Sequence, residues 1–326
     1  MKRVFAHAFA LASPLFAATA AFADEGGVSF WLPGTYGSLA AVPGTPGLNF
    51  TTFNYNDFAS VDKNAYVVRM GAIQAGLASR TNEQFISPSY VFGTPVLGGT
   101  AALGVTTAVG KNLTSVGATL AEANGRMLSG NESDSVIGMG DMSPTATLSW
   151  AQGANNFMTY LTGNIPVGIY NSWQLAAIGL GHAAIDAGGG YTFYDPATGH
   201  EFSAVVGATY NFFNPATQYK NGIDGHLDWG ASQFLTKNFQ IGAVGYLYRQ
   251  LSGDTGSGAK LGAFESRVAG IGPQVGVNFP VAGLQGYANL KGYTEFDARD
   301  RPSGWNVWFT ITLSPTGLPT APSAKN

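Results

Sequence analysis

The sequence predicts an all-β protein, built as a single transmembrane antiparallel β-barrel of about twelve strands. Three observations support this: segments of strand length, alternation of apolar with small or polar residues, and a low content of charge. In the segment 304–313, Trp305, Val307 and Phe309 share one face, and Asn306 and Trp308 share the other. Period-two alternation is typical of strands, and ten-residue strands with one apolar face are typical of membrane barrels.

The composition suits a surface that faces lipid. Only 11% of the residues are charged, whereas soluble proteins carry about 25%. Glycine is abundant, and 13% of the residues are aromatic. No stretch after the first residues reaches the roughly 18 apolar residues of a membrane-spanning helix. The chain has no cysteine and no basic surplus, which excludes thiolate chemistry and argues against nucleic acid as a partner.

The first residues read as a secretory signal peptide covering 1–23. Lys2 and Arg3 precede a short apolar stretch, and Ala21-Phe22-Ala23 fits the small-x-small cleavage pattern, so cleavage is expected after Ala23. The alternative, an N-terminal membrane anchor, needs a longer apolar stretch. A signal peptide before a barrel places the chain in the outer membrane of a Gram-negative bacterium.

The segments fall into a regular series in which short turns alternate with longer connections. Membrane barrels have tight periplasmic turns and longer external loops. Fourteen strands remain an alternative, because 65–77 and 116–123 each read as a strand or a loop helix. The twelve expected strands are 47–57, 85–95, 99–111, 139–152, 156–167, 184–195, 200–213, 225–236, 239–251, 265–280, 283–298 and 303–314.

The barrel is expected over 48–314, between an N-terminal segment, 24–47, and a flexible tail, 315–326. The N-terminal segment contains three prolines between residues 31 and 47, so it is neither a regular strand nor a helix. Its apolar side chains favour insertion into the lumen as a plug, with Trp31, Leu32 and Tyr36 as the plug candidates. A periplasmic extension packed on the barrel is the alternative.

Several short motifs follow one another along the chain in a characteristic order and spacing. They are 29–44 (SFWLPGTYGSLAAVPG), Gly140-Asp141, 164–170 (NIPVGIY), 219–222 (YKNG), 226–229 (HLDW), 242–251 (GAVGYLYRQL) and 270–274 (GIGPQ). Together they resemble the outer-membrane protein family associated with the meta-pathway of phenol degradation, and the resemblance covers nearly the whole chain after the signal. It implies a β-barrel and the passage of apolar or aromatic compounds, and it brings no established catalytic or binding residues.

The polar faces of the last strands provide the candidate lumen-lining residues. Polar and charged side chains in the membrane zone must face a wet or paired interior. They are expected either to select solutes or to fill and stabilise a narrow barrel. The candidates are His226, Asp228, Gln274, Tyr287, Asn289, Lys291, Tyr293, Glu295, Asn306 and Trp308.

No catalytic or metal-binding constellation is evident. Nucleophilic catalysis needs a serine beside a base. Only His182, His200 and His226 remain after signal cleavage; Ser203 faces away from His200, and Ser232 lies about 20 Å along the strand from His226. The chain is therefore expected not to be an enzyme, and to need no metal and no cofactor.

The predicted function is passage of small apolar or aromatic compounds across the outer membrane, with the supply of a catabolic pathway as the expected purpose. The alternative is a non-transporting structural or adhesive barrel. The expected partners are outer-membrane lipid and lipopolysaccharide, small apolar or aromatic solutes, and the barrel-assembly machinery.

Overall fold

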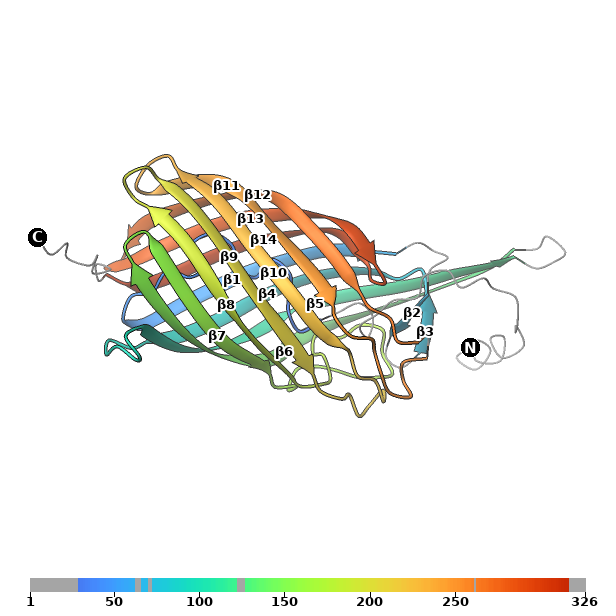
Figure 1. The fold of residues 1–326 in the computed structure, drawn as a ribbon. Helices are drawn as coiled ribbons and strands as arrows, with labels where there is room; N and C mark the ends of the chain where they lie inside the picture. The colour runs from blue at the N-terminus through green and yellow to red at the C-terminus, as the bar shows by residue number, and fades with distance from the viewer. Residues whose placement is uncertain (1–28, 62–65, 70–71, 122–126, 261, 317–326) are drawn as a thin grey trace, which may run out of the picture.

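A computed structural model of the chain describes residues 29–61, 66–69, 72–121, 127–260 and 262–316. Twelve antiparallel strands close into a barrel in the order β1-β14-β13-β12-β11-β10-β9-β8-β7-β6-β5-β4 (Figure 1). None of the described residues forms a helix long and apolar enough to cross a membrane. The predicted signal peptide, 1–23, and most of the predicted tail lie outside the described residues.

The twelve barrel strands confirm the expected number. The additional strands β2 (Tyr66–Arg69) and β3 (Ala72–Ala75) form a separate two-stranded hairpin, so the stretch 65–77 adds no strand to the wall. The barrel strands are β1 (Gly47–Ser60), β4 (Ala78–Val91), β5 (Thr100–Ala121), β6 (Met127–Gln152), β7 (Asn155–Asn164), β8 (Ala184–Asp195), β9 (His200–Asn211), β10 (Ile223–Phe234), β11 (Phe239–Gln250), β12 (Arg267–Val281), β13 (Leu284–Arg299) and β14 (Ser303–Pro315).

Two boundary predictions were wrong. The expected loop 112–138 is mostly strand, because β5 and β6 stay paired as far as Ala121 and Met127. The expected strand 85–95 begins earlier, at Ala78, and ends at Val91. Both stretches contain polar residues of the kind found in loops. Outside the bilayer, however, a hairpin needs no apolar face, and the β5–β6 hairpin projects far from the barrel in Figure 1.

The short turns gather at the end of the barrel where β1 begins and β14 ends, and the longer connections lie at the other end (Figure 1). Ala282 and Gly283 form one of these turns with φ angles of 48° and 78°. Left-handed backbone angles give two-residue hairpin turns a twist that matches the twist of the strands. The alternation predicted from the sequence thus distinguishes a short-turn end from an outer end with long connections.

A protease-site tag inserted at Gly256, in the connection between β11 and β12, is expected to be cleaved on intact cells. The same tag at Ala282 should be cleaved only after the outer membrane has been permeabilised, since short turns face the periplasm. Immunoblots of the two tagged proteins measure the difference. Cleavage at Ala282 but not at Gly256 on intact cells would invert this orientation.

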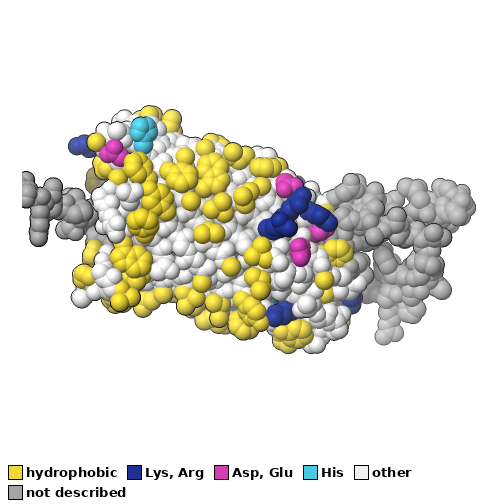
Figure 2. Space-filling model, in the orientation of Figure 1, with side chains coloured by type: hydrophobic (Ala, Val, Ile, Leu, Met, Phe, Trp, Pro, Cys, Tyr) yellow, Lys and Arg dark blue, Asp and Glu magenta, His cyan; other side chains and the backbone are white. Residues whose placement is uncertain are grey.

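The outer surface carries a belt of apolar side chains (Figure 2). On β9 and β10 the outward residues are half-exposed or exposed and mainly apolar, whereas the alternate residues are buried. Barrel closure satisfies the backbone groups of all twelve strands, as the hydrocarbon layer requires. Large exposed members of the belt include Leu161, Ile185, Val206, Ile241, Leu247, Ile271, Leu290, Phe296 and Phe309.

The belt is interrupted in the middle of β1 and β4, where the outward side chains are polar, whereas Leu48 and Phe50 on β1 and Ile86 on β4 are outward and apolar. Asn54 Nδ2 donates to Gln84 Oε1 at 3.4 Å, and Gln84 Nε2 donates to Thr52 Oγ1 at 2.6 Å. Asn56 Nδ2 donates to Asn54 Oδ1 at 2.5 Å. These hydrogen bonds lower the cost of polar groups on a surface that faces lipid.

Candidate functional site

Residues 29–46 lie against the inner face of the barrel. Their backbone turns twice, with hydrogen bonds from Thr35 N to Leu32 O and from Val42 N to Leu39 O, each 3.1 Å long. Proline cannot donate to a sheet ladder, which keeps this stretch out of the wall. At Gly47 the chain joins the wall directly as β1. We call residues 29–46 the inner segment.

A buried carboxylate and a buried ammonium hold the middle of the inner segment by its main chain. Asp228 on β10 accepts hydrogen bonds from Gly34 N at 2.9 Å and Tyr36 N at 3.0 Å. Lys291 Nζ on β13 donates to the carbonyl oxygens of Gly34 at 2.5 Å, Thr35 at 3.2 Å and Tyr36 at 3.3 Å. Since hydrogen bonds to charged groups are stronger than neutral ones, this clamp anchors the segment firmly.

Gly34 is required at the clamp for two reasons. Its φ angle is +91°, which an L side chain rarely adopts, and a Cβ atom there would lie 3.0 Å from the Tyr293 ring. Asp228 and Lys291 are themselves almost completely buried. The inner segment, by contrast, contains no charged side chain. At the clamp, the barrel therefore binds the segment through its backbone dipoles.

Toward the short-turn end, further side chains of the wall bind the inner segment. Ser38 Oγ lies 2.7 Å from Ser232 Oγ, and Gln274 Nε2 donates to Ser38 Oγ at 2.6 Å. Glu201 Oε1 accepts from Leu39 N at 2.9 Å. Thr192 Oγ1 accepts from Ala41 N at 3.0 Å. Strands β8, β9, β10 and β12 all contribute, so the segment is bound along its length.

The indole of Trp31 packs on the wall through a stacked ring contact. Its centroid lies 3.7 Å from that of His226, with 12° between the planes, and 5.8 Å from that of Tyr160. Asp186 lies beneath this stack: its Oδ2 is 3.0 Å from His226 Nε2, and its Oδ1 accepts from Tyr160 OH at 2.7 Å. Trp31 is only 5% exposed, so it covers the His226–Asp186 pair.

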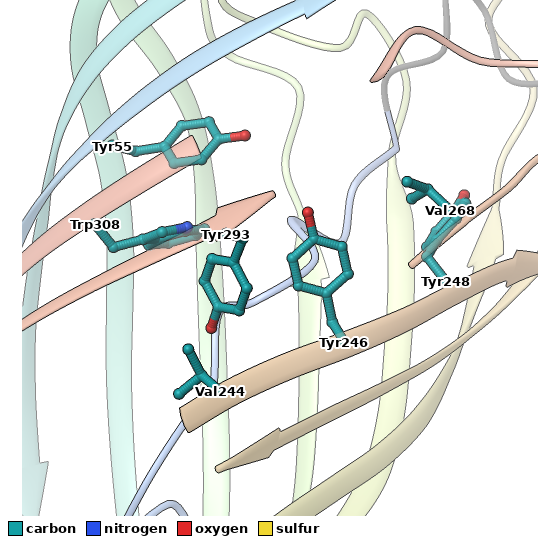
Figure 3. Close-up of a cluster of buried hydrophobic side chains, with 7 residues drawn as sticks. All are labelled: Tyr55, Val244, Tyr246, Tyr248, Val268, Tyr293 and Trp308. Atoms are coloured by element: carbon teal, nitrogen blue, oxygen red, sulfur yellow. The ribbon is translucent and has the colours of Figure 1, made fainter. Parts of the chain in front are cut away.

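A second aromatic cluster projects into the barrel from β1, β11, β13 and β14 (Figure 3). The rings of Tyr246 and Tyr293 are 4.8 Å apart, and those of Tyr55 and Trp308 are 4.6 Å apart. Trp308 Nε1 donates to Asn306 Oδ1 at 2.9 Å. Buried aromatic rings whose polar tips are bonded give the interior a rigid, largely apolar wall.

A cavity of about 200 Å³ lies between these clusters and the outer end of the barrel. Its wall combines aromatic and aliphatic side chains with carboxylates. Phe30, Leu32 and Pro33 of the inner segment form part of the same wall. Other lining residues are Tyr55, Asp57, Glu83, Phe85, Tyr170, Ile178, Glu295 and Arg301. We call this space the outer cavity.

The connection between β7 and β8 closes one side of the outer cavity. Asp141 holds it in place, because its Oδ1 accepts from Gly168 N at 2.8 Å and its Oδ2 accepts from Leu180 N at 2.9 Å. Asn164 Nδ2 donates to the same Oδ2 at 2.8 Å. Two motifs of the sequence resemblance, Gly140-Asp141 and 164–170, thus meet at this connection.

The ten candidate lumen residues all lie on inward-facing positions of the wall, in three groups. Asp228, Gln274, Lys291 and Tyr293 bond to the inner segment, and His226 lies under Trp31. Glu295 and Asn306 line the outer cavity, where Trp308 supports Asn306. Tyr287 and Asn289 bond to each other nearer the short-turn end. That they select solutes stays a prediction.

The plug candidates also differ in their surroundings. Trp31 stacks on His226, Leu32 lines the outer cavity, and Tyr36 lies 5.9 Å from the Tyr160 ring. Each of these contacts joins the inner segment to the wall or to the cavity. That the segment blocks passage stays a prediction.

Sequence reasoning missed several residues that bind the inner segment or line the outer cavity. Glu201 and Thr192 hold the segment, and Asp57, Glu83 and Arg301 line the cavity. A rule could have found two of them, because a carboxylate inside a membrane strand must face the interior. The predicted strands 47–57 and 200–213 already contained Asp57 and Glu201. Glu83 lay just outside the strand predicted at 85–95.

The three described histidines lie in separate surroundings. His226 pairs with Asp186, His182 Nδ1 lies 3.0 Å from Ala183 O, and His200 ends the turn before β9. Ser232 is bonded to Ser38 and Gln274 rather than to a base. Within the described ranges, no group of three His, Asp or Glu side chains is placed to hold a metal ion.

Comparison with known proteins supports the fold. A solved outer-membrane channel from Pseudomonas putida F1 superposes with a TM-score of 0.61 at 13% identity, covering 84% of this chain and 96% of that one. A FadL homologue from Pseudomonas aeruginosa gives a TM-score of 0.45 at 9% identity, covering 92% and 99%. The autotransporter NalP translocator domain from Neisseria meningitidis gives 0.40 at 12%, covering 84% and 90%.

The first of these similarities shows the fold of an outer-membrane β-barrel; the other two are too remote to support an argument. No curated protein matches the chain. A family model described as "Putative MetA-pathway of phenol degradation" matches residues 59–311. That match covers most of the barrel, and the chain therefore belongs to this family.

Proposed function

We propose that the protein is an outer-membrane channel for small apolar or aromatic compounds, and that the inner segment is its gate. The observation that carries the proposal is the outer cavity, whose wall is partly made by the segment itself through Phe30, Leu32 and Pro33. A solute in this cavity touches the element that separates it from the short-turn end. Pockets that bind small molecules are largely apolar with a few placed polar groups, as this one is.

The proposed path begins among the long external connections and ends at the periplasm. A solute enters the outer cavity, displaces the inner segment, and passes between the segment and the wall. Hydrogen bonds and packing hold the segment against the wall, and each hydrogen bond contributes about 0.5–1.5 kcal/mol net, or up to about 3 kcal/mol at Asp228 and Lys291. A solute that replaces some of these contacts can therefore shift the segment.

The proposal includes the cellular setting. The barrel lies in the outer membrane of a Gram-negative bacterium after cleavage of the signal peptide behind Ala23, and the barrel-assembly machinery inserts it. Its belt contacts phospholipid in one leaflet and lipopolysaccharide in the other. The lipopolysaccharide leaflet slows the diffusion of apolar compounds, and so a channel for them is useful there.

An engineered disulfide tests whether the inner segment moves. The chain has no cysteine, and Ser38 Oγ and Ser232 Oγ are 2.7 Å apart, so Ser38→Cys with Ser232→Cys places two thiols within bonding reach. Intact cells carrying the oxidised variant should take up radiolabelled toluene as slowly as cells without the protein. A reducing agent should restore the uptake rate of the wild type.

Each single-cysteine variant serves as the control, since it changes one serine without forming the cross-link. Equal uptake before and after reduction would refute the gate. Uptake that never exceeds that of cells without the protein would refute the channel.

The alternative, a non-transporting adhesive barrel, is favoured by one feature: the β5–β6 hairpin projects far beyond the wall (Figure 1). If the protein causes no uptake of toluene, the adhesive barrel becomes the favoured interpretation.

A further inference from the structure

Three carboxylates line the outer cavity from β4, β1 and β13; β4 and β1 are neighbours in the wall, and β14 lies between β1 and β13. Glu83 on β4 lies opposite Tyr55 on β1, and Asp57, two residues further along β1, lies opposite Asn306 on β14. Residues related in this diagonal way are about 7–8 Å apart. Glu295 on β13 lines the cavity at the next level toward the outer end.

These carboxylates are not neutralised by ion pairs. In the described part of the chain, Asp57, Glu83 and Glu295 form no salt bridge. Glu295 accepts from Tyr246 OH and from Gly304 N, both at 2.8 Å. Partly buried carboxylates that lie near one another without a directly paired cation are costly, because each loses hydration and repels the others.

The other charged groups of the cavity do not cancel this charge. Arg301 supplies one positive charge, and its guanidinium lies 4.9 Å from the centroid of the Tyr248 ring. Asp141 is a fourth carboxylate, fully engaged by the β7–β8 connection. The lining thus carries more negative than positive charge, which favours a cationic occupant.

Aromatic rings lie beside the carboxylates. Tyr55 and Phe85 line the outer cavity, and behind them Phe53 stacks on Phe85 with centroids 4.5 Å apart. Aromatic faces attract organic cations through the quadrupole of the ring, and the attraction grows when water is excluded. Carboxylates and aromatic faces together therefore recognise an ammonium group attached to an apolar body.

We propose that the outer cavity binds small organic ammonium ions, meaning protonated amines with one aromatic ring or a short aliphatic body, and rejects carboxylate anions of the same size. The cavity's volume of about 200 Å³ suits this class, since an apolar cavity of about 150 Å³ holds benzene in another protein. The proposal rests on the channel function and names its preferred solute class.

Binding to the purified full-length protein in detergent tests the proposal directly. Equilibrium dialysis at neutral pH would compare three ligands of nearly equal shape: benzylammonium, benzyl alcohol and benzoate. Benzylammonium should bind at least about tenfold more tightly than benzoate, equivalent to about 1.4 kcal/mol. Asp57→Asn combined with Glu83→Gln should abolish that ratio and leave the binding of benzyl alcohol unchanged.

Two further variants serve as controls for the position and the charge of the carboxylates. Glu132→Gln removes an exposed carboxylate from β6, far from the cavity lining, and should keep the wild-type ratio. Asp57→Glu retains the charge and should keep most of the preference. If the double variant does not fold, Glu83→Gln alone should reduce the ratio.

The two proposals fail in different ways. Equal binding of benzylammonium and benzoate by the wild type, or no binding of either, overturns the solute class. A preference that survives in the folded double variant overturns the assignment to Asp57 and Glu83. Neither result touches the channel itself, which is judged by toluene uptake into cells.

Discussion

Deleting residues 31–44 is expected to raise the single-channel conductance of the protein in planar lipid bilayers. The deletion removes Trp31 from its stack on His226 and the peptide units bound by Asp228 and Lys291. The two charged side chains would then line a water-filled lumen in which ions can move. The belt and the strand ladder do not depend on these residues, so heat-modifiable migration in gels should be retained.

The cross-linked variant with Ser38→Cys and Ser232→Cys supplies the matched control for this experiment. The cross-link holds the inner segment in place. While the variant is oxidised, its conductance should therefore equal or fall below that of the wild type. A deletion variant that migrates as a folded barrel but conducts no better than the wild type would show that residues 31–44 do not limit ion flow.

The second large effect concerns the lipid-facing wall. Val206→Arg should sharply reduce the amount of folded protein in outer-membrane fractions. Val206 lies near the middle of β9, is 60% exposed, and has Leu227 and Gly189 as its cross-strand neighbours. A cation at the bilayer midplane of a barrel costs about 2–4 kcal/mol. Quantitative immunoblots of heated and unheated samples measure the loss.

Ile223→Arg is the control at the edge of the same region. Ile223 is also outward and 41% exposed, but it begins β10 at the outer end. There an arginine reaches the headgroups, and the cost falls to about 0–1 kcal/mol. Nearby, Lys220 Nζ already bonds to Tyr210 OH at 2.9 Å. Equal yields of the two variants would contradict the position of the belt.

Alternation in the sequence was sufficient to predict the wall. It predicted twelve strands, and for Ala184–Asp195 it also predicted both ends. It predicted less well where β5 and β6 leave the bilayer, because lipid no longer imposes an apolar face there. The stretch 112–138 therefore read as a loop, although cross-strand pairing continues through it.

The sequence predicted single components of the candidate site but not their arrangement. Proline content indicated that the N-terminal stretch stays out of the sheet. The period-two alternation of side chains along the strands placed Asp228 and Lys291 on the polar face. That both side chains bind the main chain of residues 34–36 follows from the closure of the barrel. Gly34 is separated from them by 194 and 257 residues along the chain, and no local sequence pattern predicts contacts across such separations.

The position of the inner segment also constrains the order of assembly. Apart from Asn49 at the start of β1, its hydrogen-bond partners on the wall lie 151 to 259 residues further along the chain, so all of them are synthesised after it. The segment continues without a linker into β1, and the pairing of β1 with β14 closes the cylinder. Threading a chain through a finished cylinder is far slower than curling an open sheet around it. Such distant contacts form late in folding. We therefore expect the segment to be enclosed as the sheet curls, and the β1–β14 seam to be sealed last.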